Sequence, residues 1–160
     1  MYLHVLRHAH AGDPMAWDGS DSSRPLTDKG LAQAKRLGRF LTEQGFRTDA
    51  ILTSPKVRAS QTAEIVAGYL ALPVAVDERL AGPVDLGVLE SILRDHHDPV
   101  RPVLVGHDPD VSELIAVLCG AAGVPMRKGT FARVEVDRPL QPGFGTLRWL
   151  ISTDLLRPER

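Results

Sequence analysis

The sequence predicts an α/β fold: a three-layer α/β/α sandwich whose central sheet is mostly parallel, with an antiparallel edge strand. Short runs of strand-forming residues alternate with longer segments of helical periodicity, which is typical of parallel sheets covered by helices. The last two expected strands have no helix between them, which predicts the antiparallel edge. We expect residues 1–160 to form a single domain, because domains of about 100–150 residues are the commonest.

The first strand is expected over residues 2–7, where strand formers precede a polar loop over residues 9–23. A helix then begins after an N-cap at Thr27. Its apolar residues recur at helical spacing until Gly45 supplies a stop. Residues 49–53 are the second expected strand.

Two further helices are each expected to begin after a capping residue that is followed by proline. Ser54-Pro55 and Asp108-Pro109 each place a capping side chain before a proline, and proline suits the first position of a helix. The first of these helices would end near residue 70, and the second would cover residues 111–119. Helix capping accounts for Asp108, and we assign it no catalytic role.

The remaining elements follow from short apolar runs between turn residues. They are strands over 73–76, 101–106, 130–136 and 146–151, and a helix over 84–95.

Composition excludes several classes of function. The chain has 19 Lys and Arg against 20 Asp and Glu, a balance that argues against a nucleic-acid or membrane-surface partner. The single Cys119 excludes an internal disulfide and a multi-cysteine zinc site. The longest apolar stretch, residues 114–124, is short of the ~20 residues of a membrane span, and Arg7 and His8 interrupt the first apolar run. We therefore expect a cytoplasmic protein that acts as a monomer.

Polar residues follow three of the expected strands. They are Arg7-His8, the segment from Ser54 to Arg58, and Gly106-His107-Asp108. Ligands of open α/β sheets bind beyond the carboxyl ends of the strands, so we expect Arg7, His8, Arg58 and His107 to converge. Guanidinium groups and helix N-termini bind phosphate well, which predicts a pocket for a phosphoryl group.

Two histidines among arginines have a specific use in such a pocket. A neutral imidazole can attack phosphorus, and nearby arginines lower its pKa by like-charge repulsion. His8 is therefore the candidate nucleophile. His107 is expected to donate a hydrogen bond to a phosphoryl oxygen as negative charge develops.

Four blocks in this order resemble the motifs of the histidine phosphatase superfamily, which has the phosphoglycerate-mutase-like fold, and in particular its small bacterial SixA-type phosphohistidine phosphatases. The similarity spans Met1 to about Cys119. The blocks are Arg7-His8-Ala9, Arg24-Pro25-Leu26-Thr27, Ser54-Pro55 with Arg58-Ala59 and Gln61-Thr62, and Gly106-His107-Asp108-Pro109.

The resemblance implies that His8 becomes phosphorylated and that Arg7, Arg58 and His107 form the phosphate pocket. Arg24 would join them from the long loop. The family uses neither a metal nor an organic cofactor. The implied partner is a protein carrying phosphohistidine, or a small phosphorylated substrate.

The sequence departs from the family pattern at two points. Ala9 replaces the usual glycine, a small change if the backbone there does not need a positive φ. No residue clearly matches the glutamate that protonates the leaving group in larger members. Glu78 is nearest in sequence, and Asp21 in the long loop is the preferred candidate for a general acid.

A weak or absent acid favours one class of substrate. An alkoxide gains much from a positioned acid, whereas a phosphoramidate can leave as neutral imidazole. The hypothesis is therefore a preference for P–N over P–O bonds. The alternatives are a small-molecule phosphomonoesterase at the same site and a non-catalytic module that binds phosphohistidine. The roles of His10 and Trp17, which lie near the expected pocket, stay open.

Overall fold

A six-stranded sheet forms the centre of the protein in the computed structural model, which describes residues 1–158. Its strands are β1 (Tyr2–Arg7), β2 (Ala50–Thr53), β3 (Val74–Val76), β4 (Pro102–Gly106), β5 (Phe131–Glu135) and β6 (Thr146–Ile151). The α-helices of the described residues are α1 (Asp28–Glu43), α2 (Val57–Leu70), α3 (Leu86–Asp95) and α4 (Asp110–Cys119).

The strand order is β3-β2-β4-β1-β5-β6. The first four strands in this order pair in parallel, whereas β5 is antiparallel to both β1 and β6. This confirms the mostly parallel sheet. β5 alone runs opposite to the other strands, so its pairings with β1 and with the edge strand β6 are the antiparallel ones. The carboxyl ends of β1, β2 and β4 consequently lie together at one edge of the sheet.

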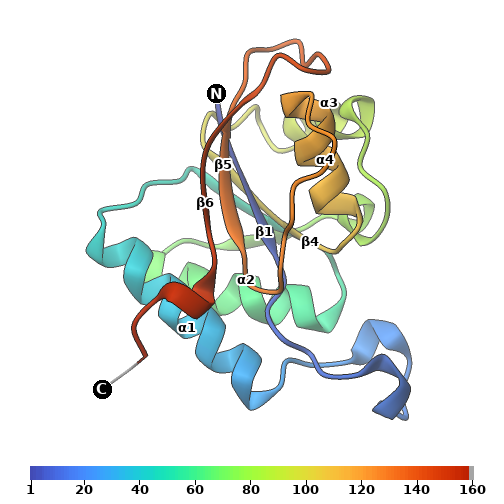
Figure 1. Ribbon diagram of the computed structural model, residues 1–160, viewed down its shortest axis with the longest axis vertical. Helices are drawn as coiled ribbons and strands as arrows, with labels where there is room; N and C mark the ends of the chain where they lie inside the picture. The colour runs from blue at the N-terminus through green and yellow to red at the C-terminus, as the bar shows by residue number, and fades with distance from the viewer. Residues whose placement is uncertain (159–160) are drawn as a thin grey trace.

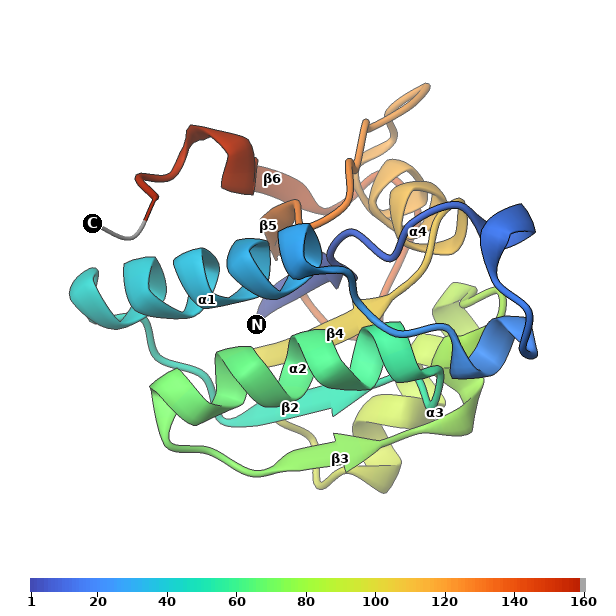
Figure 2. The ribbon, with the colours of Figure 1, turned by 90° about the horizontal axis from the view of Figure 1, so that it is seen from below.

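Helices cover both faces of the sheet, which confirms the three-layer sandwich (Figures 1 and 2). Side chains of β1 alternate between the two layers, as the period of a strand requires. Leu3 and Val5 pack in one apolar cluster with α3 and α4, and Leu6 packs in the other cluster with α1 and α2.

The start of α1 agrees with the prediction. Thr27 Oγ1 accepts a hydrogen bond from the backbone N–H of Gly30 at 3.2 Å. Gly30 is also needed for close packing, because a Cβ there would lie 2.0 Å from the carbonyl oxygen of His10. The helix therefore lies directly against the loop that follows β1.

The predicted caps of α2 and α4 are wrong. α2 begins at Val57, after Lys56, and α4 begins at Asp110, after Pro109; neither cap residue makes a side-chain cap bond. Ser54 and Asp108 instead contact residues of the strand ends described below. α3 begins at Leu86, two residues later than predicted, because the side chain of Asp85 accepts from the N–H of Val88 at 2.8 Å.

None of the helices in the described residues has the length and apolar character needed to cross a membrane.

Candidate active site

The ends of β1, β2 and β4 bring the predicted site residues together. Arg7 pairs in register with Gly106, and the N–H of His8 donates to the Gly106 carbonyl at 3.0 Å. The rings of His8 and His107 consequently lie close, with centroids 5.3 Å apart.

His8 is held in one tautomer at the end of β1. It is only 5% exposed, and its Nδ1 lies 2.7 Å from the carbonyl oxygen of Ala9. A carbonyl oxygen can only accept, so Nδ1 carries the hydrogen and Nε2 keeps its lone pair. The imidazole therefore has the nitrogen that a nucleophile needs.

Burial keeps the imidazole of His8 neutral. The pKa of His8 is lowered to about 3, mainly by burial and in smaller part by repulsion from His107, Arg58 and Arg7. The hydrogen bond to Ala9 acts in the opposite direction. The direction agrees with the prediction, but desolvation contributes more than the repulsion by arginines that the sequence suggested.

Arg7 and Arg58 each have a buried donor without a partner. Nη1 of Arg7 donates to the Met126 carbonyl at 2.8 Å and lies 3.5 Å from the Asp108 carboxylate. Arg58 donates from Nη1 and Nη2 to the carbonyl and carboxylate oxygens of Asp21, at 2.7 and 2.9 Å. Within the described residues, Nε of each arginine is buried and unpaired. Buried donors rarely lack a partner, so these two N–H groups are available to the oxygens of a ligand.

His107 supplies a third unpaired nitrogen. Its Nε2 lies 2.7 Å from Ser54 Oγ, and its Nδ1 is buried with no partner in the described chain. Ser54 Oγ accepts from the N–H of Lys56 at 3.2 Å, which frees the Ser54 hydroxyl proton to donate to Nε2. This arrangement favours a neutral His107 with its hydrogen on Nδ1. Burial lowers the pKa of His107 to about 4, with a further contribution from Arg58.

The hydrogen bonds of Asp21 argue against its predicted role as the general acid. Its carboxylate accepts hydrogen bonds from Arg58 and, at 3.3 and 3.4 Å, from Arg24. Burial raises the pKa of Asp21, but the hydrogen bonds and charges of the two arginines outweigh it, and the pKa is lowered overall. A proton donor needs the opposite shift. Asp21 is therefore an anion that pairs with Arg58 and Arg24.

The contacts of Arg24 also differ from the predicted contact with phosphate. It is buried, and its Nη1 donates to the carbonyl oxygens of Ala11 and Gly12 at 2.7 and 3.2 Å. Since Nε and Nη2 donate to Asp21, most of its donors are used within the loop. Arg24 thus holds the loop beside Arg58, and its contacts do not support direct binding of phosphate.

The other candidates lie at the margin. Glu78 is exposed, and no hydrogen bond in the described chain joins its side chain to the strand ends. His10 is half-buried and bonds through Nδ1 to Thr27 Oγ1 at 2.7 Å. Trp17 donates from Nε1 to the Ser20 carbonyl within the loop. Within the described residues, none of the three side chains is hydrogen-bonded to His8.

Sequence reasoning did not find several residues that position the site. The Ser54 hydroxyl orients His107. In the sequence, Ser54 followed by Pro55 predicted only a helix cap. Gly129, with φ +77°, donates its N–H to the carbonyl oxygens of both Arg7 and His8, at 3.1 and 3.0 Å. Neighbouring Lys128 adds positive charge: burial lowers its pKa, and so does repulsion, first from Arg7. No local pattern marks these loop residues as part of the site.

The described residues hold no cluster of three or more His, Cys, Asp or Glu side chains that could bind a metal ion. The positive groups at the strand ends are those of arginine and lysine side chains, since His8 and His107 are neutral.

Comparison with known families agrees with this geometry. The model of the Histidine phosphatase superfamily (branch 1) matches residues 3–107, more than half of the chain. The chain belongs to the histidine phosphatase superfamily. The matched residues include β2, β4, all of β1 after Tyr2, and the candidate residues at the carboxyl ends of these strands.

Individual proteins of known name are also similar to this histidine phosphatase. It is 33% identical to Phosphohistidine phosphatase SixA of Escherichia coli (strain K12), over 95% of this chain and 94% of that protein. A solved structure of the protein histidine phosphatase SixA complexed with tungstate has a TM-score of 0.83 at 30% identity, covering 96% and 98% of the two chains. The Alpha-ribazole Phosphatase from Shigella flexneri shares the fold, with a TM-score of 0.73 at 21% identity over the whole of both chains. The family and SixA similarities support phosphatase activity.

The buried histidines of this histidine phosphatase predict a loss of stability in acid. The pKa values of His4 and His107 are lowered to about 4, and that of His8 to about 3. The unfolded chain takes up these protons near pH 6.5, and the folded chain only at lower pH. The free energy of unfolding should therefore fall as pH drops from about 6.5 to 4, by up to about 1.4 kcal/mol per pH unit for each histidine.

Urea unfolding at pH 7 and pH 5 measures this effect. His107→Asn should lose less stability between the two pH values than the wild type, because one buried histidine is absent. His97 is exposed, with φ +67°, a conformation that asparagine tolerates, so His97→Asn is the matched control. Equal pH dependence in His107→Asn and the wild type would contradict a neutral, buried His107.

Proposed function

We propose that the protein removes phosphoryl groups from phosphohistidine in other proteins, through a phosphohistidine formed on its own His8. The observation that carries this proposal is the set of buried, unpaired nitrogens on Arg7, Arg58 and His107 around a neutral His8. The named activity of the E. coli relative and the tungstate in the similar SixA structure also support it, because tungstate is a tetrahedral oxyanion like phosphate.

In the first step, the Nε2 lone pair of His8 forms a bond to phosphorus. The bond from phosphorus to the substrate nitrogen breaks, and its electron pair stays on the leaving imidazole. The unpaired N–H groups of Arg7 and Arg58, and Nδ1–H of His107, donate to phosphoryl oxygens. Such donors stabilise the transition state most in a water-poor site, where their orientation is already set.

In the second step, water attacks the phosphorus of phosphohistidine. The P–N bond to His8 breaks, the electron pair returns to Nε2, and the proton of the attacking water leaves to solvent or to the phosphate. The products are inorganic phosphate and the neutral imidazole. The Nδ1 hydrogen bond to Ala9 holds the ring in place throughout.

The leaving group determines the substrate preference. Asp21 is held as an anion by two arginines, so this part of the site supplies no carboxylic acid for an alkoxide. A phosphohistidine substrate carries a ring nitrogen that solvent can protonate, and imidazole then leaves as a neutral molecule. Protein phosphohistidine fits this pocket better than a phosphate ester does.

The comparison of two peptides with the same sequence tests this preference. One carries phosphohistidine and the other phosphoserine at the same position. We expect kcat/KM to be about 10²-fold or more higher for phosphohistidine, since a general acid contributes about 10²–10⁴-fold to an ester. Phosphate release, corrected for the spontaneous loss from phosphohistidine, is the measurement. Faster hydrolysis of phosphoserine would favour the phosphomonoesterase alternative.

The revised role of Asp21 gives another prediction. Asp21→Asn keeps an oxygen acceptor for Arg58 but removes the charge and any acid. We expect kcat on the phosphohistidine peptide to change by less than about 10-fold, whereas loss of a general acid costs about 10²–10⁴-fold. Steady-state kinetics of both peptides provide the measurement. A fall of 100-fold confined to the phosphoserine peptide would restore Asp21 as the acid.

A further inference from the structure

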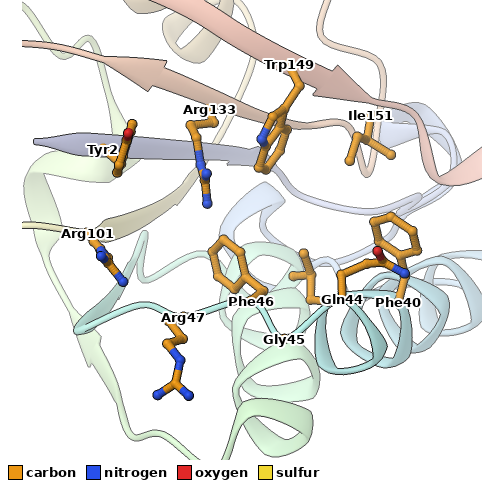
Figure 3. Close-up of a pocket in the computed structure, with 11 residues that line it drawn as sticks. Tyr2, Phe40, Gln44, Gly45, Phe46, Arg47, Arg101, Arg133, Trp149 and Ile151 are labelled. Carbon is orange, nitrogen blue, oxygen red and sulfur yellow. The ribbon is translucent and has the colours of Figure 1, made fainter.

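A cavity separate from the residues around His8 lies between α1 and the face of the sheet formed by β1, β5 and β6. It has a volume of about 420 Å³ and lies among the C-terminal end of α1, the segment 44–47, the start of β1 and strands β5 and β6 (Figure 3). Small-molecule sites commonly measure about 300–1,000 Å³. The cavity runs along the sheet from Tyr2, at the start of β1, to Ile151, which lies level with Leu6 through Phe131, and its lining includes none of Arg7, His8, Arg58 and His107.

Arg133 is held rigidly at the centre of this cavity. Its Nε donates to Nε2 of His4 at 3.0 Å, and Nδ1 of His4 lies 3.1 Å from the carbonyl oxygen of Pro102. The carbonyl only accepts, so Nδ1 carries the hydrogen and Nε2 is the acceptor for Arg133. Burial lowers the pKa of His4 to about 4, which keeps it a neutral acceptor near pH 7.

Aromatic rings surround the guanidinium of Arg133. Its central carbon lies 4.9 Å from the ring centroid of Tyr2, 5.1 Å from that of Trp149 and 6.0 Å from that of Phe46. The described residues give Nη1 and Nη2 no hydrogen-bond partner. The N–H groups at the edge of the guanidinium are therefore free to bind an oxyanion as a fork.

Two more arginines line the cavity, and their charge is not balanced there. Arg47 and Arg101 are exposed, and the eleven described lining residues include no Asp or Glu. The carboxylate of nearby Asp49 accepts instead from the backbone N–H groups of Val100 and Arg101, both at 2.8 Å. Three arginines without a lining carboxylate favour an anion with more than one negative charge, such as phosphate.

The other end of the cavity is mostly apolar, with Gln44 as a polar side chain beside Phe40. Figure 3 shows Arg101 and Arg47 toward one end, Phe40 and Ile151 toward the other, and Arg133 between them. A free inorganic anion would leave this apolar end unfilled. A ligand that joins a phosphate to a flat ring would occupy both halves.

We propose that this cavity binds a nucleotide, with its phosphates on the three arginines and its base against the apolar side chains at the other end. This site is separate from the phosphatase site and does not depend on the reaction proposed there. Its ligand is recognised by an arginine whose orientation His4 and three aromatic rings maintain.

Fluorescence of Trp149 tests the proposal directly. The chain has two tryptophans, so Trp17→Phe leaves Trp149, which lines the cavity, as the sole tryptophan. His8→Ala in the same protein removes the proposed nucleophile, so that the probe is not consumed. ADP should change the emission saturably. Adenosine and pyrophosphate, which each match one half of the cavity, should bind at least 10-fold more weakly.

Substitutions at the cavity identify the site of binding. Arg133→Gln and, separately, the double variant Arg47→Gln with Arg101→Gln should each weaken ADP binding at least 10-fold. The double variant changes exposed side chains only, so it tests the proposal even if Arg133→Gln does not fold. Arg94→Gln, on the exposed surface of α3, and Arg58→Ala, in the phosphatase site, should bind ADP as before. No saturable change at millimolar ADP, or equal binding by all variants, would overturn the proposal.

Discussion

His8→Ala is expected to abolish turnover, with a loss of roughly 10⁴- to 10⁶-fold in kcat, as for other covalent nucleophiles that act within a catalytic group. In the structure, His8 has a neutral imidazole whose Nδ1 is committed to Ala9, so Nε2 carries the only lone pair that can attack phosphorus. Alanine supplies no nucleophile. The buried donors on Arg7, Arg58 and His107 remain, and the variant should still bind an oxyanion such as tungstate.

The fold should survive this substitution. His8 contributes one side-chain hydrogen bond, and a typical bond of this kind adds about 1 kcal/mol to stability. Circular dichroism and urea unfolding check that the variant is folded, and single-turnover phosphate release measures its activity. His97→Asn on the surface is the matched control for the loss of an imidazole.

Mass spectrometry separates the enzyme from a module that only binds phosphohistidine. After brief incubation with a phosphohistidine peptide and an acid-free quench, the wild type should carry a phosphoryl group on His8, and His8→Ala should carry none. Retained turnover in His8→Ala, or phosphate on another histidine of the wild type, would contradict the assignment of His8.

The layer structure was predictable because it depends on periodicity along the chain. Alternation in β1 sends Leu3 and Val5 to one layer and Leu6 to the other, and the structure has this arrangement. The starts of α2 and α4 were less predictable. Ser54 and Asp108 have the side chains of helix caps, but their oxygens contact His107 and Arg7 from neighbouring strands. A local motif cannot distinguish these two uses of the same oxygen.

The convergence of Arg7, His8, Arg58 and His107 was predictable from topology, because parallel strands end at one edge of the sheet. The position of the long loop over residues 9–23 was not predictable, since it depends on contacts between residues that are distant in sequence. Arg24 donates to the carbonyls of its own loop, and Asp21 reaches Arg58 across 37 positions of the chain. The cause of the low pKa of His8 was also hidden, because burial is a property of the assembled fold.

Arg58→Ala is expected to lower kcat/KM by about 10²–10³-fold, the cost of removing one preoriented donor from an oxyanion site. Arg58 is buried, its Nε has no partner in the described chain, and its charge lies near His8 and His107. Steady-state hydrolysis of the phosphohistidine peptide measures the loss. Arg138→Ala is the matched control, because it breaks the exposed pairs with Glu90 and Asp98 but has no place in the site.

Because Arg58 pairs with Asp21, a loss of activity in Arg58→Ala has two possible explanations. A second substitution, at Asp21, distinguishes them. If Arg58 binds the phosphoryl group, Asp21→Asn should not restore activity to Arg58→Ala, because the missing donor is still missing. If Arg58 only neutralises Asp21, removing both charges should bring kcat/KM close to the wild-type value. The Asp21 side chain is 52% exposed, so water can solvate its carboxylate once Arg58 is gone, and the residual cost of that charge should be small. We therefore expect the double variant to be as inactive as Arg58→Ala, and Arg58→Lys, which keeps the charge without the fork, to recover only part of the activity.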